Sequence, residues 1–272
     1  MKHVIIGNGN LGNSIATELL KRNNTKQENN IIKIFSTSNG WKYPTSLDPI
    51  YDEIPMHVWV TVGAGSVEQA KANYLPFIDL HIKLPIELAQ NLNDMTYLHV
   101  FSTDYVLDKR LDNWPMNRSL YALSKDSMEE ALTFMDRPKT CVYRVGSLYG
   151  THKPNKCFPY KLKKNSLKNE PTLPINFVTP TPTDWLASVL ISNLPFAQNS
   201  MAIFNVAPEG CVSVVEWGSL ILDKKIKESG IDISRPANSE IGCDLPHQIK
   251  NTWLDLWKDR EHEWKEILSK IG

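Results

Sequence analysis

The N-terminal stretch MKHVIIGNGNLG restricts this chain to a small set of folds. Residues 3–7 are a short apolar run, and residues 11–19 then place a leucine or isoleucine at every fourth position, the spacing of one helix face. The turn between them reads G-N-G-N-L-G, and it matches G-x-G-x-x-G at Gly7, Gly9 and Gly12. Such glycines permit a sharp turn and let backbone N–H groups approach a pyrophosphate. The sequence therefore predicts a dinucleotide site at Gly7, Gly9, Asn10, Leu11 and Gly12.

Strand-like and helix-like stretches alternate after this turn, which predicts an α/β fold with a Rossmann-type doubly wound parallel sheet. The expected strands are residues 31–36, 57–63, 96–102, 140–146 and 201–206. The expected helices are residues 69–91, interrupted at Pro76 and Pro85, and residues 121–135, 214–229 and 251–271.

The composition changes at Thr151, after which residues 153–182 are rich in Lys, Asn and Pro and have weak periodicity. We interpret this stretch as an excursion that packs over the sheet edge. The expected division is a dinucleotide-binding domain at 1–150, to which 175–205 return, and a smaller substrate-binding region at 151–174 and 206–272. A tryptophan stripe in the last helix is typical of core or of a dimer surface.

Charge and cysteine usage exclude several classes of protein. The 272 residues include 30 basic and 30 acidic side chains, so no electrostatic footprint for nucleic acid or an anionic membrane is present. Four separated cysteines without a C-x-x-C motif indicate neither a metal site nor a disulfide framework. The N-terminal apolar run is too short for a signal peptide, and no stretch approaches the roughly 18 apolar residues of a membrane helix. These features predict a soluble cytoplasmic protein.

The residues after the second expected strand bear on the choice of cofactor. Proteins that prefer NAD commonly place an acid there, on the ribose 2′-hydroxyl. This chain has Ser36 and Thr37 instead, with Lys42 nearby, a set suited to a 2′-phosphate. We therefore expect NADP, with NAD as the alternative if the segment is only a polar turn.

Polar and small residues follow two further strands. Gly63, Ala64 and Gly65 would let a cofactor pass close to the backbone, and Ser102 and Thr103 stand at the carboxyl end of another strand, where open α/β sheets bind ligands. Tyr121 and Lys125 are four residues apart, so a helix places both on one face. A cation beside a phenol favours the phenolate, which predicts a lowered pKa for Tyr121 and proton transfer to a carbonyl.

Five motifs in order make the chain resemble an extended short-chain dehydrogenase/reductase, and most of all the dTDP-4-dehydrorhamnose reductase group. They are the glycine turn, S-T-D-Y-V-L-D from Ser102, the pair Tyr121 and Lys125, the segment Arg144 to Gly150, and R-P-A-N-S from Arg235. The resemblance spans nearly the whole chain.

That resemblance implies reduction of a C4 keto group on a nucleotide-linked deoxysugar by NAD(P)H, or epimerisation of such a sugar. Tyr121 would be the general acid, Lys125 would hold the nicotinamide ribose and Thr103 would hydrogen-bond the carbonyl. The sugar nucleotide would meet Thr103, Asp104, Ser147, Asn155, Phe158 and Arg235. Relatives often dimerise through helices beside the active site, so a homodimer is one expected assembly.

The chain also departs from that family. The glycine turn is one residue shorter than usual, Ser147 replaces a substrate-contacting Trp, and the loop between Thr103 and Tyr121 is shortened. His81 stands where many relatives have an Asn that binds a structural water. We interpret His81 as an ordinary helix residue, the alternative being a replacement proton relay.

Two further hypotheses follow from these departures. One is a non-catalytic subunit of the same fold that binds NADP and regulates a partner, although Thr103, Tyr121 and Lys125 together favour an enzyme. The other is a reductase or epimerase of a small carbonyl compound without a nucleotide, against which Arg235 argues because a guanidinium suits a diphosphate.

Overall fold

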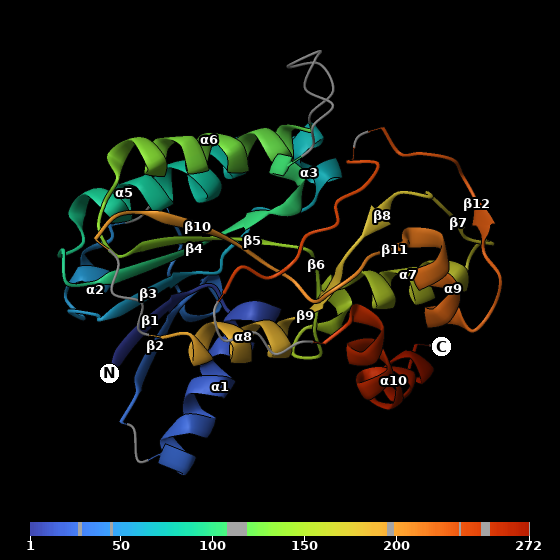
Figure 1. Cartoon of the computed structure of the whole chain (residues 1–272), viewed down its shortest axis with the longest axis horizontal. Helices are drawn as coiled ribbons and strands as arrows, with labels where there is room; N and C mark the ends of the chain where they lie inside the picture. Colours follow the sequence, from blue (N-terminus) through green and yellow to red (C-terminus); the bar gives the residue numbers. More distant parts are fainter. Residues whose placement is uncertain are drawn as a thin grey trace.

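Six parallel strands form a central sheet in the order β10-β5-β4-β3-β1-β2 (Figure 1). This computed structural model describes residues 1–26, 29–43, 46–107, 119–194, 199–233, 235–245 and 251–271. The strands are β1 (Lys2–Ile6), β2 (Ile31–Phe35), β3 (His57–Val60), β4 (Tyr97–Thr103), β5 (Thr140–Val145) and β10 (Ala202–Val206). β2 is added on one side of β1, and β3 and the later strands are added on the other side. In such sheets a ligand crevice is expected at the carboxyl end of the strands where this order switches, next to β1. The predicted doubly wound sheet is confirmed.

Helices cover both faces of this sheet because its strands are apolar on both sides. Alternate residues of β1 show the arrangement: Ile5 packs beneath α1 and α8, whereas Val4 and Ile6 pack beneath α2, α5 and α6 (Figure 1). The helices of these layers are α1 (Asn10–Lys26), α2 (Asp48–Tyr51), α3 (Val67–Ala72), α4 (Leu75–Phe77), α5 (Leu84–Asn91), α6 (Leu120–Met135) and α8 (Thr183–Ser192).

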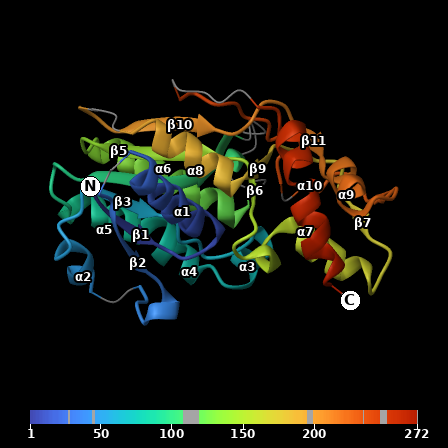
Figure 2. The same ribbon diagram turned by 90° about the horizontal axis from the view of Figure 1, so that it is seen from below.

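A second apolar core lies beyond the carboxyl ends of the strands, as the turned view shows (Figure 2). Tyr149, Trp217, Trp257 and Trp264 meet in its centre, with the ring of Tyr149 5.7 to 6.1 Å from those of the three tryptophans. The surrounding elements are α7 (Phe158–Ser166), α9 (Val214–Leu222), α10 (Trp253–Ser269), β6 (Ser147–Tyr149), β7 (Thr172–Leu173), β8 (Phe177–Val178), β9 (Pro180–Pro182), β11 (Val212–Ser213) and β12 (Lys227–Glu228). The tryptophan stripe of α10 is therefore core.

One sequence prediction in this region is wrong. The expected helix 214–229 ends at Leu222, because Asp223 adopts a left-handed conformation with φ 51° and the chain then enters β12, which pairs with β7. The segment 153–182, expected as an excursion over the sheet edge, has secondary structure of its own. It contains α7, whose Leu162 is buried in the second core, and the short strands β7 to β9.

The predicted interruptions of the helical stretch 69–91 are confirmed. Pro76 lies at the start of α4, where a missing N–H costs no hydrogen bond, and Pro85 lies where the π-helical turn passes into α5. Between them, η2 (Ile78–Lys83) is a π-helical turn. Such turns widen the helix by one residue and are frequent at functional sites.

Candidate active site

The glycine-rich turn after β1 has the geometry that a dinucleotide requires. Gly7 has φ +111°, a conformation that other residues rarely adopt. A Cβ on Gly12 would lie 2.1 Å from the carbonyl oxygen of Gly7, so helix and strand could not pack with a larger residue there. A Cβ on Gly9 would meet nothing within 4 Å. The backbone at Gly9 is therefore open to an approaching phosphate at the N-terminus of α1, where Asn10 and Leu11 begin the helix.

The end of β2 offers neutral hydrogen-bonding groups. Ser36 is buried, and its Oγ lies 2.8 Å from Oγ of Ser38. Thr37 begins a 3₁₀ turn, η1 (Thr37–Asn39), in which Asn39 accepts the Ser36 N–H. Residues 36–39 contain no carboxylate. Because these groups are neutral donors and no acid is among them, they fit the ribose 2′-phosphate of NADP better than the free ribose hydroxyls of NAD.

The loop after β3 is fastened by His81 of the π-helical turn. The amide N–H of Ala64 donates to Nε2 of His81 at 3.2 Å, and Nδ1 lies 2.9 Å from Oγ of Ser124 on α6. Nε2 accepts, so Nδ1 carries the proton of the neutral ring. Burial, followed by the charge of Lys125, lowers the pKa of His81 to about 2. Gly63 lies beside this ring, and Gly65 has φ +139°. His81 is therefore a buried helix residue that is hydrogen-bonded at both ring nitrogens.

A pocket of about 240 Å³ opens at the carboxyl end of β4. Ser102 and Thr103 end that strand, as predicted. The pocket is lined by Gly65, Ser66, Val67, Ser102, Thr103, Asp104, Tyr105, Tyr121, Val145, Gly146, Ser147, Leu148 and Arg235. It brings together Thr103, Asp104, Tyr121, Ser147 and Arg235 of the predicted site. Asn155 and Phe158 are not among the lining residues: Asn155 is exposed, and Phe158 stacks on Trp217 in the second core, 4.9 Å between ring centroids.

Tyr121 lies at the start of α6, which Ser119 caps by accepting the Ala122 N–H. Its ring meets that of His81 edge-on, 5.6 Å between centroids. Burial, followed by the negative charge of Asp104, raises the pKa of Tyr121 above its ordinary value. The prediction that this pKa is lowered is therefore wrong for this structure, because burial and Asp104 outweigh the hydrogen bond with Thr103 and the charge of Arg235, which act to lower it. At neutral pH the phenol is protonated, the form that can donate a proton.

Lys125 is one turn further along α6 and is buried. Its Nζ donates to the carbonyl oxygen of Phe101 at 2.7 Å, which fixes the ammonium beside β4. Burial lowers its pKa to about 8, although the charge of Glu129 acts in the opposite direction. Glu129 in turn forms a two-pronged ion pair with Arg144 of β5, with Nη2 to Oε2 at 2.5 Å. The cation of the site is thus supported by a buried carboxylate.

Asp104 is a buried carboxyl in the pocket wall, only 3% exposed. Its Oδ1 accepts the hydroxyl of Thr103 at 2.8 Å, and its Oδ2 has no hydrogen-bond partner among the described residues. Burial raises the pKa of Asp104 to about 6, which hydrogen bonds to the carboxylate only partly offset. A group that titrates near neutrality therefore controls where the Thr103 hydroxyl points.

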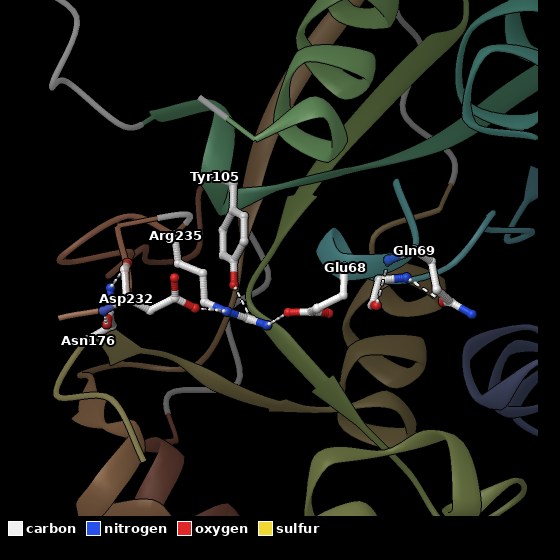
Figure 3. Close-up of polar contacts among 7 residues, drawn as sticks. Glu68, Gln69, Tyr105, Asn176, Asp232 and Arg235 are labelled. Carbon is white, nitrogen blue, oxygen red and sulfur yellow. Dashed lines mark hydrogen bonds and ion pairs between the residues drawn. The ribbon is translucent and has the colours of Figure 1, made fainter. Parts of the chain in front are cut away.

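Arg235 lines the pocket and lies among polar partners from three other parts of the chain (Figure 3). Its guanidinium donates to the hydroxyl of Tyr105 at 2.9 Å, to Glu68 of α3 at 2.8 Å and to Asp232 at 3.1 Å. Asn176 holds Asp232 in place through its backbone. The motif R-P-A-N-S indicated Arg235, and S-T-D-Y-V-L-D contains its partner Tyr105, whereas no pattern in the sequence indicated its partner Glu68.

No cluster of His, Cys, Asp or Glu among the described residues could hold a metal ion. Within the same residues, no helix has the length and apolar character needed to cross a bilayer.

Comparisons with known proteins found similarity in structure but not in sequence. No family model matches the chain, and no curated protein sequence matches it. Solved structures do match. A dTDP-4-dehydrorhamnose reductase from Clostridium acetobutylicum is 20% identical over 99% of this chain and all of its own, with a TM-score of 0.75. The same kind of protein from Bacillus anthracis, in complex with NADP, is 18% identical over 96% of this chain and 98% of its own, with a TM-score of 0.77.

A third solved structure is a UDP-glucuronic acid 4-epimerase from Bacillus cereus, in complex with UDP-glucuronic acid and NAD. It is 15% identical over 98% of this chain and all of its own, with a TM-score of 0.73. From its first strand to its last helix, this chain therefore has the fold of dTDP-4-dehydrorhamnose reductases and sugar-nucleotide epimerases.

Proposed function

We propose that this protein is an NAD(P)H-dependent oxidoreductase of the extended short-chain dehydrogenase/reductase type, which reduces the 4-keto group of a nucleotide-linked deoxysugar. NADP is the expected cofactor, and NAD is the alternative. The observation that carries the proposal is the shared pocket of Thr103, Tyr121 and Arg235 at the sheet edge, with Lys125 buried behind it. In support, two of the solved structures named above are dTDP-4-dehydrorhamnose reductases, and the third is an epimerase of a nucleotide-linked sugar.

The chain's own groups account for the proton in this reaction. When bound, the nicotinamide supplies a hydride to the carbonyl carbon. Tyr121, whose pKa is raised, donates its phenolic proton to the carbonyl oxygen and regains one from solvent. The Thr103 hydroxyl hydrogen-bonds the same oxygen once it turns away from Asp104. Lys125 orients the ribose and stabilises the phenolate that forms.

We assign the nucleotide diphosphate to Arg235 and the sugar to the pocket wall that includes Asp104 and Ser147. Arg235 belongs to the region 151–174 and 206–272, which we propose as the substrate-binding part. Residues 1–150 with 175–205 would hold the dinucleotide. In support, α8 and β10 complete the layers of the central sheet.

The test is oxidation of NADPH by the purified protein with a panel of 4-keto-6-deoxy sugar nucleotides. Tyr121→Phe should reduce turnover by about 100-fold or more, the usual range for a lost general acid, and leave NADPH binding intact. Tyr160→Phe, in the second core, is the matched control. Equilibration of two sugars without net NADPH consumption would identify an epimerase instead. NADPH binding without turnover on any sugar would favour the non-catalytic subunit.

A further inference from the structure

A lysine from outside the dinucleotide-binding segment reaches the glycine-rich turn. Nζ of Lys153 donates to Oδ1 of Asn8 at 2.9 Å, and Asn8 is the residue between the first two glycines of the turn. The backbone of Lys153 is held in place as well. Its N–H donates to Oδ1 of Asn10 at 2.6 Å, and Asn10 Nδ2 returns a hydrogen bond to its carbonyl oxygen at 2.9 Å. Two asparagines of the turn therefore fix the position of one ammonium.

Asn8 connects this ammonium to the end of β2. Its Nδ2 donates to Oγ of Ser38 at 2.5 Å, and Ser38 lies 2.8 Å from Oγ of Ser36. In Rossmann folds the end of the second strand faces the adenosine ribose, whereas the pyrophosphate lies over the glycine turn and the helix N-terminus. The hydrogen-bonded row from Lys153 to Ser36 therefore runs toward the ribose and away from the open backbone at Gly9.

No carboxylate among the described residues forms an ion pair with this cation. Among the ion pairs between described residues, none involves Lys153, and the first turn of α1 contains no acid. An ammonium has three donors, and the amide oxygen of Asn8 uses one of them. Lys42, the first base after the end of β2, is exposed.

We propose that Lys153, together with Asn8, Ser36 and Ser38, binds the 2′-phosphate of NADP(H) and makes the protein prefer it to NAD(H). The proposal rests on the proposed function, because it requires a dinucleotide over the glycine turn. It adds a residue that lies outside that turn and β2, from a segment expected on sequence to serve the substrate.

The experiment measures equilibrium binding of NADPH and NADH separately, by titration of nicotinamide fluorescence, with no sugar present. Lys153→Gln should weaken NADPH binding by about 10- to 100-fold, the range for a lost charge-assisted hydrogen bond, and NADH binding by less than about threefold. Lys153→Arg, which keeps the charge, should restore most of the preference. Lys156→Gln, an exposed lysine of the same segment, is the matched control. Thermal unfolding of each variant reports whether it folds.

Three outcomes would overturn the assignment. Equal weakening of NADPH and NADH would make Lys153 a pyrophosphate or structural contact. An unchanged preference in Lys153→Gln, with the loss appearing in Lys42→Gln, would move the phosphate site to Lys42. If the wild-type protein binds neither dinucleotide, the proposed function fails and this proposal fails with it. In the first two outcomes the dinucleotide still binds, so the proposed function stands.

Discussion

The hydroxyl of Thr103 donates to the carboxylate of its chain neighbour Asp104, 2.8 Å away. The hydroxyl proton of Thr103 is thus used by Asp104 while that carboxyl is ionised. Once Asp104 takes up a proton, its own O–H can donate to Thr103, and the threonine proton becomes available to a carbonyl. The two residues therefore link the protonation state of a buried acid to the hydrogen bond that a substrate would receive.

The first prediction concerns stability near this acid. The pKa of Asp104, about 6 in the folded protein, exceeds its ordinary value of 3.8. The folded state therefore holds the proton more tightly, and its free energy of unfolding should fall as pH rises from about 4 to about 6, by roughly 1 to 3 kcal/mol. Asp104→Asn should remove this fall and be more stable than the wild type at pH 7.5. Urea unfolding at several pH values measures it, with exposed Asp52→Asn as control. An identical pH dependence in Asp104→Asn would contradict the assignment.

The second prediction concerns acid unfolding. Nδ1 of His57 lies 3.0 Å from Nε2 of His99 beneath α1, and both rings are buried. Burial lowers the pKa of His57 to about 3 and that of His99 well below its usual range. The unfolded chain binds these protons first, so stability should be complete above pH 6.5 and fall by about 1.4 kcal/mol per pH unit for each histidine below it. Asp104 changes the free energy of unfolding in the opposite direction between pH 4 and 6. The observed slope of that free energy against pH is therefore the histidine contribution minus the Asp104 contribution.

The measurement is the free energy of unfolding at pH 5, 6 and 7. His57→Gln should reduce the slope by the contribution of one histidine, whereas His262→Gln, at an exposed position of α10, should leave it unchanged. Equal slopes in the wild type and His57→Gln would mean that the buried ring already carries its proton.

The third prediction separates two roles of His81. Loss of its ring leaves the Ala64 N–H and the Ser124 hydroxyl without their partner, which should cost about 1 to 3 kcal/mol of stability in His81→Phe. Dinucleotide binding should weaken as the loop after β3 loosens. Since the pKa of His81 is about 2, the ring stays neutral at working pH. The plot of kcat/KM against pH should therefore keep its rising and falling limbs in His81→Phe. A limb that disappears in His81→Phe would show that this histidine relays protons.

The fourth prediction concerns Arg235 and its carboxylate partner. Arg235→Ala should raise KM for the sugar nucleotide about tenfold or more, since it removes a charged contact to the diphosphate, and should change kcat less. Glu68 holds the same guanidinium, so a diphosphate must displace it. Glu68→Gln should therefore lower KM. An unchanged KM in Arg235→Ala would remove the argument for a nucleotide substrate.

The central sheet could be predicted from the sequence because each of its strands is a short apolar run. Strand-like and helix-like stretches alternate along the chain, and this order is typical of a parallel sheet covered by helices. The second core could not. The sequence of α7 begins with Phe158-Pro159 and carries several lysines, and its buried face emerges only where Leu162 meets α9 and α10. Likewise Lys224 and Lys225 favour a continued helix, yet Ile226 is buried after the left-handed turn at Asp223. Tertiary contacts override local preference at both places.

Motif spacing predicted that Thr103, Tyr121 and Lys125 come together, since strand ends and helix faces follow from periodicity. The direction of the Tyr121 pKa could not be predicted, because it depends on burial and on the orientation of Asp104. The same limit applies to Lys153, whose contact with Asn8 joins residues 145 positions apart. The contact between Glu68 and Arg235 could not be predicted for the same reason.

The position of β10 at the edge of the sheet has a consequence for biosynthesis. α8 supplies much of the apolar cover over α1, and β10 pairs with β5, so both the N-terminal helix and the active-site strands rely on residues 183 to 206. A ribosome must therefore deliver three quarters of the chain before this layer can close. Until then the apolar surface that α8 covers in the folded protein stays exposed to water, the condition under which nascent chains are prone to aggregate.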